Sequence, residues 1–150
     1  MQIGGKVSAI LTRKMVSSVW TIEPNATVIT AIRLMDEKNA GALPVVDNGR
    51  LVGIVSERDY TRKVILKQRS SQEILVSEIM TTQLLTVAPS DSATECMQIM
   101  TEKRVRHLPV LEGTDLVGIL SIRDVVNWLM SAQTATIESL ERYVTGHYPA

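Results

Sequence analysis

Cysteine and phenylalanine are nearly missing from this sequence of 150 residues, which has a single cysteine, Cys96, and no phenylalanine. One cysteine cannot form an intramolecular disulfide, and such a sequence is typical of a protein from a reducing compartment. Aromatic residues make up only 3% of the chain. The core must therefore be built from the aliphatic residues Val, Ile, Leu and Met.

An excess of charge and a long apolar run are missing as well. The chain has 16 basic and 16 acidic residues, whereas a non-specific nucleic-acid binder needs a basic excess. No stretch approaches the roughly 18 apolar residues of a membrane span, and residues 1–14 lack the pattern of a signal peptide. We therefore predict a soluble, cytoplasmic protein with no nucleic-acid partner and no membrane partner.

The sequence does contain an internal repeat. Residues 20–60 align without a gap with residues 85–125, and 15 of these 41 positions are identical. A period of this length indicates a duplicated supersecondary unit. Because one copy of about 45 residues buries too little surface to be stable alone, we expect the copies to pack against each other about a pseudo-two-fold axis.

Each copy has the pattern of a strand, a helix, two strands joined by a turn, and a second helix. In the first copy, residues 19–22 are a short strand candidate, and Thr27 can cap a helix over the apolar residues of 28–35. The Asn48-Gly49 pair predicts a hairpin turn. A second helix is expected from about residue 56 to about residue 67.

These patterns predict an α/β fold with two β-α-β-β-α repeats. The first repeat covers residues 7–67 and the second covers residues 74–131, with a polar link between them. In the second repeat, Ser92 and Glu95 have the spacing of a helix capping box. Residues 132–150 are predicted to form an amphipathic C-terminal helix, which packs on the core or contacts another protomer.

A polar motif follows the last strand of each copy, as Ser56-Glu-Arg-Asp59 and again as Ser121-Ile-Arg-Asp124. A helix that begins at the serine offers unpaired backbone N–H groups to a phosphate. The aspartate can accept hydrogen bonds from both hydroxyls of a ribose. The same spacing is also that of a capping box, which stabilises a helix by about 1 kcal/mol and needs no ligand. From the residues alone, both interpretations stay open.

The repeat resembles the CBS domain, and the tandem copies resemble a CBS pair, also called a Bateman module. The matching segments are Gly-h-x-Ser-x-x-Asp at 53–59 and 118–124, Leu-Pro-Val at 43–45 and 108–110, and Val-Ser-Glu-Ile-Met-Thr at 76–81. The resemblance covers about residues 7–130. More narrowly, the chain is similar to small standalone CBS-pair proteins of bacteria and plant organelles.

This resemblance implies two composite clefts for adenosine ligands, each with an aspartate on one repeat and an adenine-binding wall on the other. One cleft would use Ile54, Ser56, Arg58, Asp59, Ser77, Met80, Thr82, Val105, Arg106 and His107, with Arg62 and Lys63 at its phosphate end. The other would use Ile119, Ser121, Arg123, Asp124, Thr12, Met15, Ser17, Ala40, Gly41 and Ala42.

The two clefts differ in charge. Arg106 and His107 stand where the first copy has Gly41 and Ala42, and the helix after Asp59 is basic, whereas the helix after Asp124 is apolar. We therefore expect the cleft of the first motif to bind the more anionic ligand. The basic run after Asp59 is also compatible with a solvated helix face.

Catalysis and metal binding have little support in the sequence. Cys96 and the two histidines lack the spacing of metal ligands, and no histidine is repeated beside the two serines to activate them as nucleophiles. We expect a non-catalytic regulatory module, with no required cofactor, that binds an adenine nucleotide. AMP is the first choice, followed by ATP, ADP and NAD(H).

Ligand occupancy would be passed to an effector protein that the sequence does not identify, and the module is expected to be a homodimer. Two other classes stay open. One is a dimeric interaction scaffold whose clefts are vestigial, and the other is an enzyme that acts on a nucleotide.

Overall fold

The computed structural model describes residues 5–14 and 19–131. The chain divides into two compact units. The first combines Met1–Val16, Val87–Leu108 and Leu120–Ala150, and the second combines Ser17–Thr86 with Pro109–Ile119. The predicted helix at 132–150 lies outside the described residues. In the part that is described, no helix is long and apolar enough to cross a bilayer.

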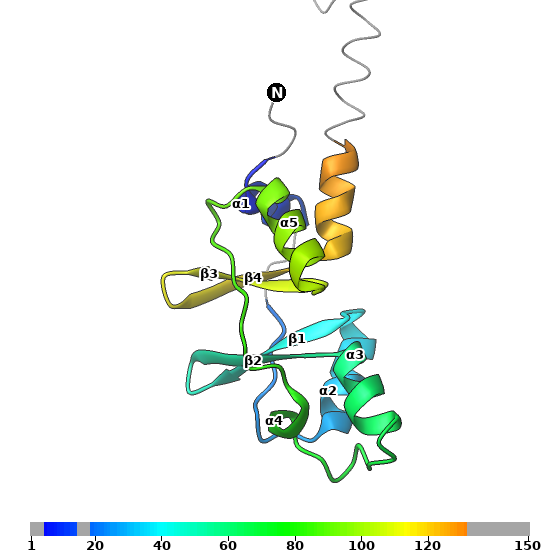
Figure 1. Ribbon diagram of the computed structural model, residues 1–150. Coiled ribbons are helices and arrows are strands. Elements are labelled where there is room, and N and C mark those ends of the chain that lie inside the picture. Colours follow the sequence, from blue (N-terminus) through cyan, green and yellow to red (C-terminus); the bar gives the residue numbers. More distant parts are fainter. Residues whose placement is uncertain (1–4, 15–18, 132–150) are drawn as a thin grey trace, which may run out of the picture. The chain divides into compact units, whose positions relative to one another are not determined.

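A hairpin forms the centre of the second unit (Figure 1). Strand β1, Ala42–Asp47, pairs antiparallel with β2, Arg50–Ser56. Asn48 and Gly49 join them with φ angles of 49° and 79°, and two successive positive φ angles define the tight turn that matches the strand twist. The hairpin predicted from the Asn-Gly pair is confirmed.

Helix α2, Val28–Lys38, precedes this hairpin and packs one apolar face on it. Thr27 occupies the N-cap with extended backbone, but its hydroxyl bonds to the hydroxyl of Thr30 at 2.8 Å and makes no cap hydrogen bond. The helix ends at Asn39, where φ is 52°. The predicted helix is confirmed, whereas its expected side-chain cap is not formed.

The strand expected at residues 19–22 is wrong, because only an isolated bridge forms there, between Ile22 and Val45. Ile22 donates its N–H to the carbonyl of Pro44 and accepts from the N–H of Val46. Pro24 follows two residues later, and a proline cannot donate to a strand ladder. The pairing therefore stops after a single residue.

The helix expected after Ser56 is present but changes type. Helix α3, Glu57–Tyr60, continues directly as the π-helix η1, Thr61–Ile65. A short helix, α4, Val76–Ile79, follows the loop. Single π-turns occur frequently at functional sites, and this one comes immediately after the first Ser-x-x-Asp motif.

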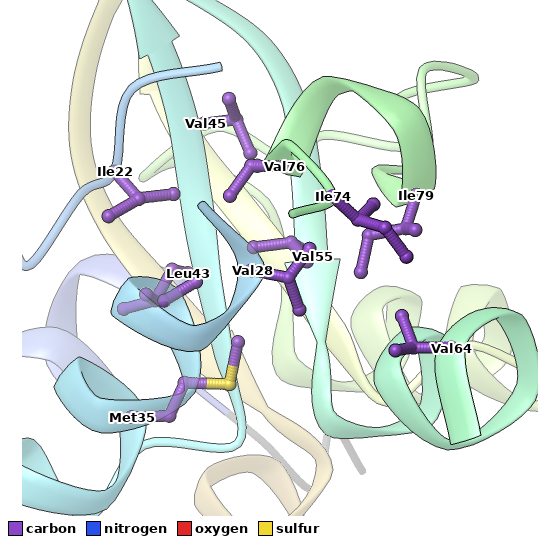
Figure 2. Packing of buried hydrophobic residues seen from close by; sticks show 11 residues of the cluster. Ile22, Val28, Met35, Leu43, Val45, Val55, Val64, Ile74, Val76 and Ile79 are labelled. Atoms are coloured by element: carbon purple, nitrogen blue, oxygen red, sulfur yellow. The ribbon is translucent and has the colours of Figure 1, made fainter. Parts of the chain in front are cut away.

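The core of the second unit is aliphatic, as predicted. Its largest fully buried side chains include Met35, Leu43, Val55 and Ile79, and Figure 2 shows how α2, the hairpin and α4 contribute to it. Among the described residues, no aromatic side chain is buried in the core. Burial of such side chains is the main favourable term in folding.

The first unit has an equivalent set of elements. Helix α1, Val7–Lys14, and helix α5, Ala93–Lys103, belong to it. Ser92 caps α5 by accepting the N–H of Glu95 at 3.1 Å, so this part of the predicted capping box is confirmed. A further helix begins at Ile122 and continues through the last described residue, 131.

A second hairpin joins strand β3, His107–Glu112, to strand β4, Asp115–Ser121. Its turn contains Gly113, with a φ of 64°. Together the elements give a mixed α/β chain in which each repeat contributes a two-stranded sheet and helices. The predicted fold class is confirmed.

Candidate functional site

The first Ser-x-x-Asp motif forms a complete capping box at the start of α3. The N–H of Asp59 donates to Ser56 Oγ at 3.1 Å, and the N–H of Ser56 donates to Asp59 Oδ2 at 2.9 Å. The Ser56 hydroxyl lies 3.0 Å from the same carboxylate oxygen. The chain needs this cap because the first N–H groups of a helix have no partner within the helix.

The second motif has the same geometry. The N–H of Asp124 donates to Ser121 Oγ at 3.1 Å, and the N–H of Ser121 donates to Asp124 Oδ2 at 2.8 Å. The capping interpretation of both motifs is therefore confirmed. Both aspartates remain partly exposed to solvent, at 13% for Asp59 and 17% for Asp124.

Each aspartate also forms an ion pair with a lysine. Lys63 Nζ lies 3.0 Å from Asp59 Oδ1, and Lys14 Nζ lies 2.8 Å from Asp124 Oδ2. Lys63 also donates to the backbone carbonyl of Ile79 at 2.7 Å. A salt bridge within hydrogen-bonding distance of a mostly covered carboxylate holds the cation beside the motif. Sequence reasoning placed Lys63 here but missed Lys14.

The two lysines do not occupy equivalent positions in the repeat. At the spacing of 65 residues, the counterpart of Lys63 is Trp128, and the counterpart of Lys14 is Ile79. One motif therefore takes its cation from the helix that follows it, and the other takes its cation from α1. The charge is kept in both repeats although neither lysine position is repeated.

An additional helical turn places Lys14. In the first unit, Val7 N–H donates to the carbonyl of Asp91, and in the second unit Val76 N–H donates to the carbonyl of Ala26. Asp91 and Ala26 are 65 residues apart, whereas the two valines are 69 apart. Since α1 has 8 residues and α4 has 4, α1 is longer by one turn, and Lys14 is the last residue of that turn.

Trp128 fills the position that Lys63 occupies in the other repeat. A side chain at Gly5 would approach Trp128 Cζ2 to 2.6 Å, so only glycine fits at this point. The guanidinium of Arg13 lies 5.5 Å from the centroid of the Trp128 ring, within the range of a cation–π interaction. The indole is thus packed into the first unit, which agrees with a role in packing.

The backbone before the central strand contacts the motif of its own repeat. Ile122 N–H donates to the carbonyl of Arg106 at 2.8 Å, and Glu57 N–H donates to the carbonyl of Gly41 at 3.1 Å. Burial, together with the charges of Lys14 and Arg106, lowers the pKa of His107, and Asp124 opposes this shift. His107 therefore lies within the electrostatic range of the second motif.

Several other predicted site residues gather around the first motif. Ile54 pairs with Thr81 through two backbone hydrogen bonds of 3.0 and 2.8 Å. The Thr81 hydroxyl, which sequence reasoning did not include, lies 3.5 Å from Asp59 Oδ1. The Met80 sulfur packs where a Cβ at Gly53 would be 2.7 Å away. Ser77, Thr82, Arg58 and Arg62 are exposed.

The remaining predicted residues are divided between the units. Ser121, Arg123, Asp124, Val105, Arg106, His107 and Thr12 belong to the first unit, and Ile119, Ala40, Gly41 and Ala42 belong to the second. The Thr12 hydroxyl donates to the carbonyl of Ser8 at 2.9 Å. Met15 and Ser17 lie outside the described residues. The pairing of the residues into two composite clefts stays a prediction.

Chemistry beyond binding finds little support in the described part of the chain. No group of three or more His, Cys, Asp or Glu residues in it has a geometry that could hold a metal ion. Burial raises the pKa of the Cys96 thiol to about 11, with smaller contributions from Asp91 and Glu95. A thiol with so high a pKa is a poor nucleophile at neutral pH.

Comparison with known proteins identifies the repeats. The family model for the CBS domain matches residues 7–65 and 76–131. The chain belongs to the CBS domain family. The CBS pair is 40% identical over 127 residues to CBS domain-containing protein CBSX3, mitochondrial, of Arabidopsis thaliana, a match that covers 81% of this chain and 62% of that relative.

Bacterial proteins resemble the CBS pair over more of their own length. CBS domain-containing protein YhcV of Bacillus subtilis is 36% identical over 121 residues, which cover 81% of this chain and 86% of the relative. The solved structure of a putative signal-transduction protein with CBS domains from Burkholderia ambifaria has a TM-score of 0.80 and 47% identity, and the match covers 85% of this chain and 95% of that one.

Proposed function

We propose that this CBS pair is a non-catalytic regulatory module that binds adenine nucleotides at its two Ser-x-x-Asp motifs. AMP is the first choice of ligand, and ATP, ADP and NAD(H) follow. Occupancy would favour one arrangement of the protein and so shift its population toward that arrangement. An effector protein that senses the difference would receive the signal.

The observation that carries the proposal is the repeated pairing of a partly covered aspartate with a lysine, at Asp59 with Lys63 and at Asp124 with Lys14. A carboxylate accepts hydrogen bonds from the hydroxyls of a ribose, and an ammonium binds phosphate as a point charge. Each motif therefore combines the two groups that a nucleoside phosphate needs. Membership of the CBS family supports the same ligand class.

The capping boxes do not remove the carboxylates from use. On Asp59, the backbone cap occupies Oδ2 while Lys63 contacts Oδ1, and each carboxylate oxygen can accept two hydrogen bonds. Capping fixes the orientation of the aspartate at the first turn of the helix. A carboxylate fixed in this way loses little entropy when a ligand binds to it.

The second candidate function is a dimeric interaction scaffold without a ligand. Large apolar side chains on the surface favour it, since Leu66 is 69% exposed and Met130 is 60% exposed, and exposed apolar groups can mark interfaces. A homodimer is compatible with both candidates. Size-exclusion chromatography with light scattering would give the mass in solution with and without nucleotide.

A thermal-shift panel separates the two functions. AMP, ADP, ATP, NAD and NADH would each be added to the whole chain at increasing concentration. A ligand at about 100 times its Kd stabilises a protein by about 2.7 kcal/mol, which for this size raises Tm by roughly 5–10 °C. The sensor requires such a shift with at least one nucleotide, and a flat response to all five would favour the scaffold.

A further inference from the structure

The lysine beside each motif cannot be explained by the repeat itself. Lys63 is replaced by Trp128 in the second repeat, and Lys14 is replaced by Ile79. An inherited structural contact would appear at matching positions in both copies. Instead, two different helices supply an ammonium to within 3.0 Å of the same carboxylate group.

Helix capping does not require these lysines. Each cap is closed by the serine hydroxyl, the aspartate and their two backbone N–H groups. The Lys63 side chain is 44% exposed and that of Lys14 is 29% exposed, and ion pairs near the surface contribute little to stability. A role in ligand recognition accounts better for a cation that is kept at both motifs.

A ligand that binds the aspartate must compete with the lysine. The hydroxyls of a ribose would take the carboxylate oxygen that Lys63 or Lys14 now contacts, and the ammonium would need a new anionic partner. A phosphate on the same ligand supplies one, and the flexible four-carbon chain of lysine lets the ammonium turn toward it. Neutral adenosine has no such group and leaves the cation without a partner.

We propose that Lys14 and Lys63 determine the specificity of the two sites for phosphorylated nucleosides, by exchanging an aspartate partner for the ligand's phosphate. The inference rests on the proposed function, because it concerns the same sites. It assigns Lys14 to the site of Asp124, where the sequence pattern gives no cation. The two sites would then share one recognition principle built from different helices.

The test compares the affinities of adenosine and AMP by isothermal titration calorimetry on the full chain. Lys63→Met is measured in an Asp124→Ala background and Lys14→Met in an Asp59→Ala background, so that each titration reports one site. The ratio of AMP affinity to adenosine affinity should fall about tenfold or more, as expected for a lost charged hydrogen bond. Adenosine affinity should stay constant or rise, because the aspartate is released.

Matched variants separate recognition from general charge. Lys67→Met and Lys103→Met remove one positive charge each at exposed positions, and the affinity ratio should not change. Lys63→Arg and Lys14→Arg keep the charge and should retain a preference for AMP. If Lys63→Met does not fold, Lys63→Gln keeps a donor for the Ile79 carbonyl and should show the same fall in the ratio.

The possible results decide the matter at two levels. If both ligands bind the wild-type chain and lose affinity by the same factor in the lysine variants, the lysines only support the structure and the inference is overturned. An unchanged ratio overturns it as well. If neither adenosine nor AMP binds the wild-type chain, the proposed function fails and the inference fails with it.

Discussion

The two repeats build the same capped aspartate but differ in what surrounds it. Around Asp59, the cap and the lysine contact different carboxylate oxygens, and a π-helix carries Lys63. Around Asp124, the cap and the lysine share Oδ2, and Lys14 comes from the additional turn of α1. Duplication thus fixes the carboxylate and its cap, while the positive charge has been placed independently in each copy.

The largest expected effect tests whether the two cores are equally important. Leu43 and Leu108 occupy matching positions and are both fully buried. Replacing either by Ala should lower the free energy of unfolding by about 2–5 kcal/mol, through lost transfer energy and a residual cavity. Chemical denaturation of both variants gives the two values. A change below about 1 kcal/mol in one of them would show that its repeat contributes little to global stability.

The next effect concerns Trp128, which has no lysine counterpart in its own repeat. Gly5→Ala should destabilise the protein by about 1–3 kcal/mol, because the new methyl group would lie 2.6 Å from a ring that cannot bend away. Denaturation curves measure the loss. In a double-mutant cycle with Trp128→Leu, most of the loss should disappear, and an additive result would contradict the packing of the indole on Gly5.

The capping boxes should give a smaller and nearly equal effect. Ser56→Ala and Ser121→Ala each remove the side-chain acceptor for the third N–H of a helix, which costs about 1 kcal/mol. The Ser56 variant should lose slightly more, since its hydroxyl also lies 3.0 Å from Asp59 Oδ2. Thermal unfolding of the two variants compares them, with Ser→Thr at each site as the control that keeps a cap.

The smallest effect is a dependence of stability on pH that comes from the second repeat. Burial lowers the pKa of His107 in the folded chain, so the unfolded chain binds a proton more readily. Stability should therefore fall as the pH drops from about 7.5 through the ordinary histidine pKa near 6.5. Tm measured between pH 8 and pH 5 should vary less in His107→Gln, and an identical slope would contradict the shift.

Local sequence patterns predicted much of the fold. Asn48-Gly49 specified its hairpin because two positive φ angles suit few other residue pairs, and the Ser-x-x-Asp spacing specified both caps. Residues 19–22 were wrong as a strand, since the propensity of Ile22 could not extend the pairing past Pro24. The π-turn after Tyr60 has no short sequence signature and could not be predicted.

The candidate site was only partly accessible to sequence reasoning. Asp59, Asp124 and Lys63 belong to the repeated motif or to the helix after it, so the alignment led to them directly. Lys14 lies before the aligned region, in a helix whose additional turn changes the spacing between the repeats from 65 to 69 residues. Only the geometry of α1 brings its ammonium to Asp124.

The most direct test of the central claim is the titration of AMP into the wild-type chain, Asp59→Ala, Asp124→Ala and the double variant by isothermal titration calorimetry. Circular dichroism would establish that each variant is folded. We expect binding in the wild-type chain, the loss of one site in each single variant, and no heat of binding in the double variant. Binding of wild-type strength in the folded double variant would contradict the claim that the two aspartates hold the ligand.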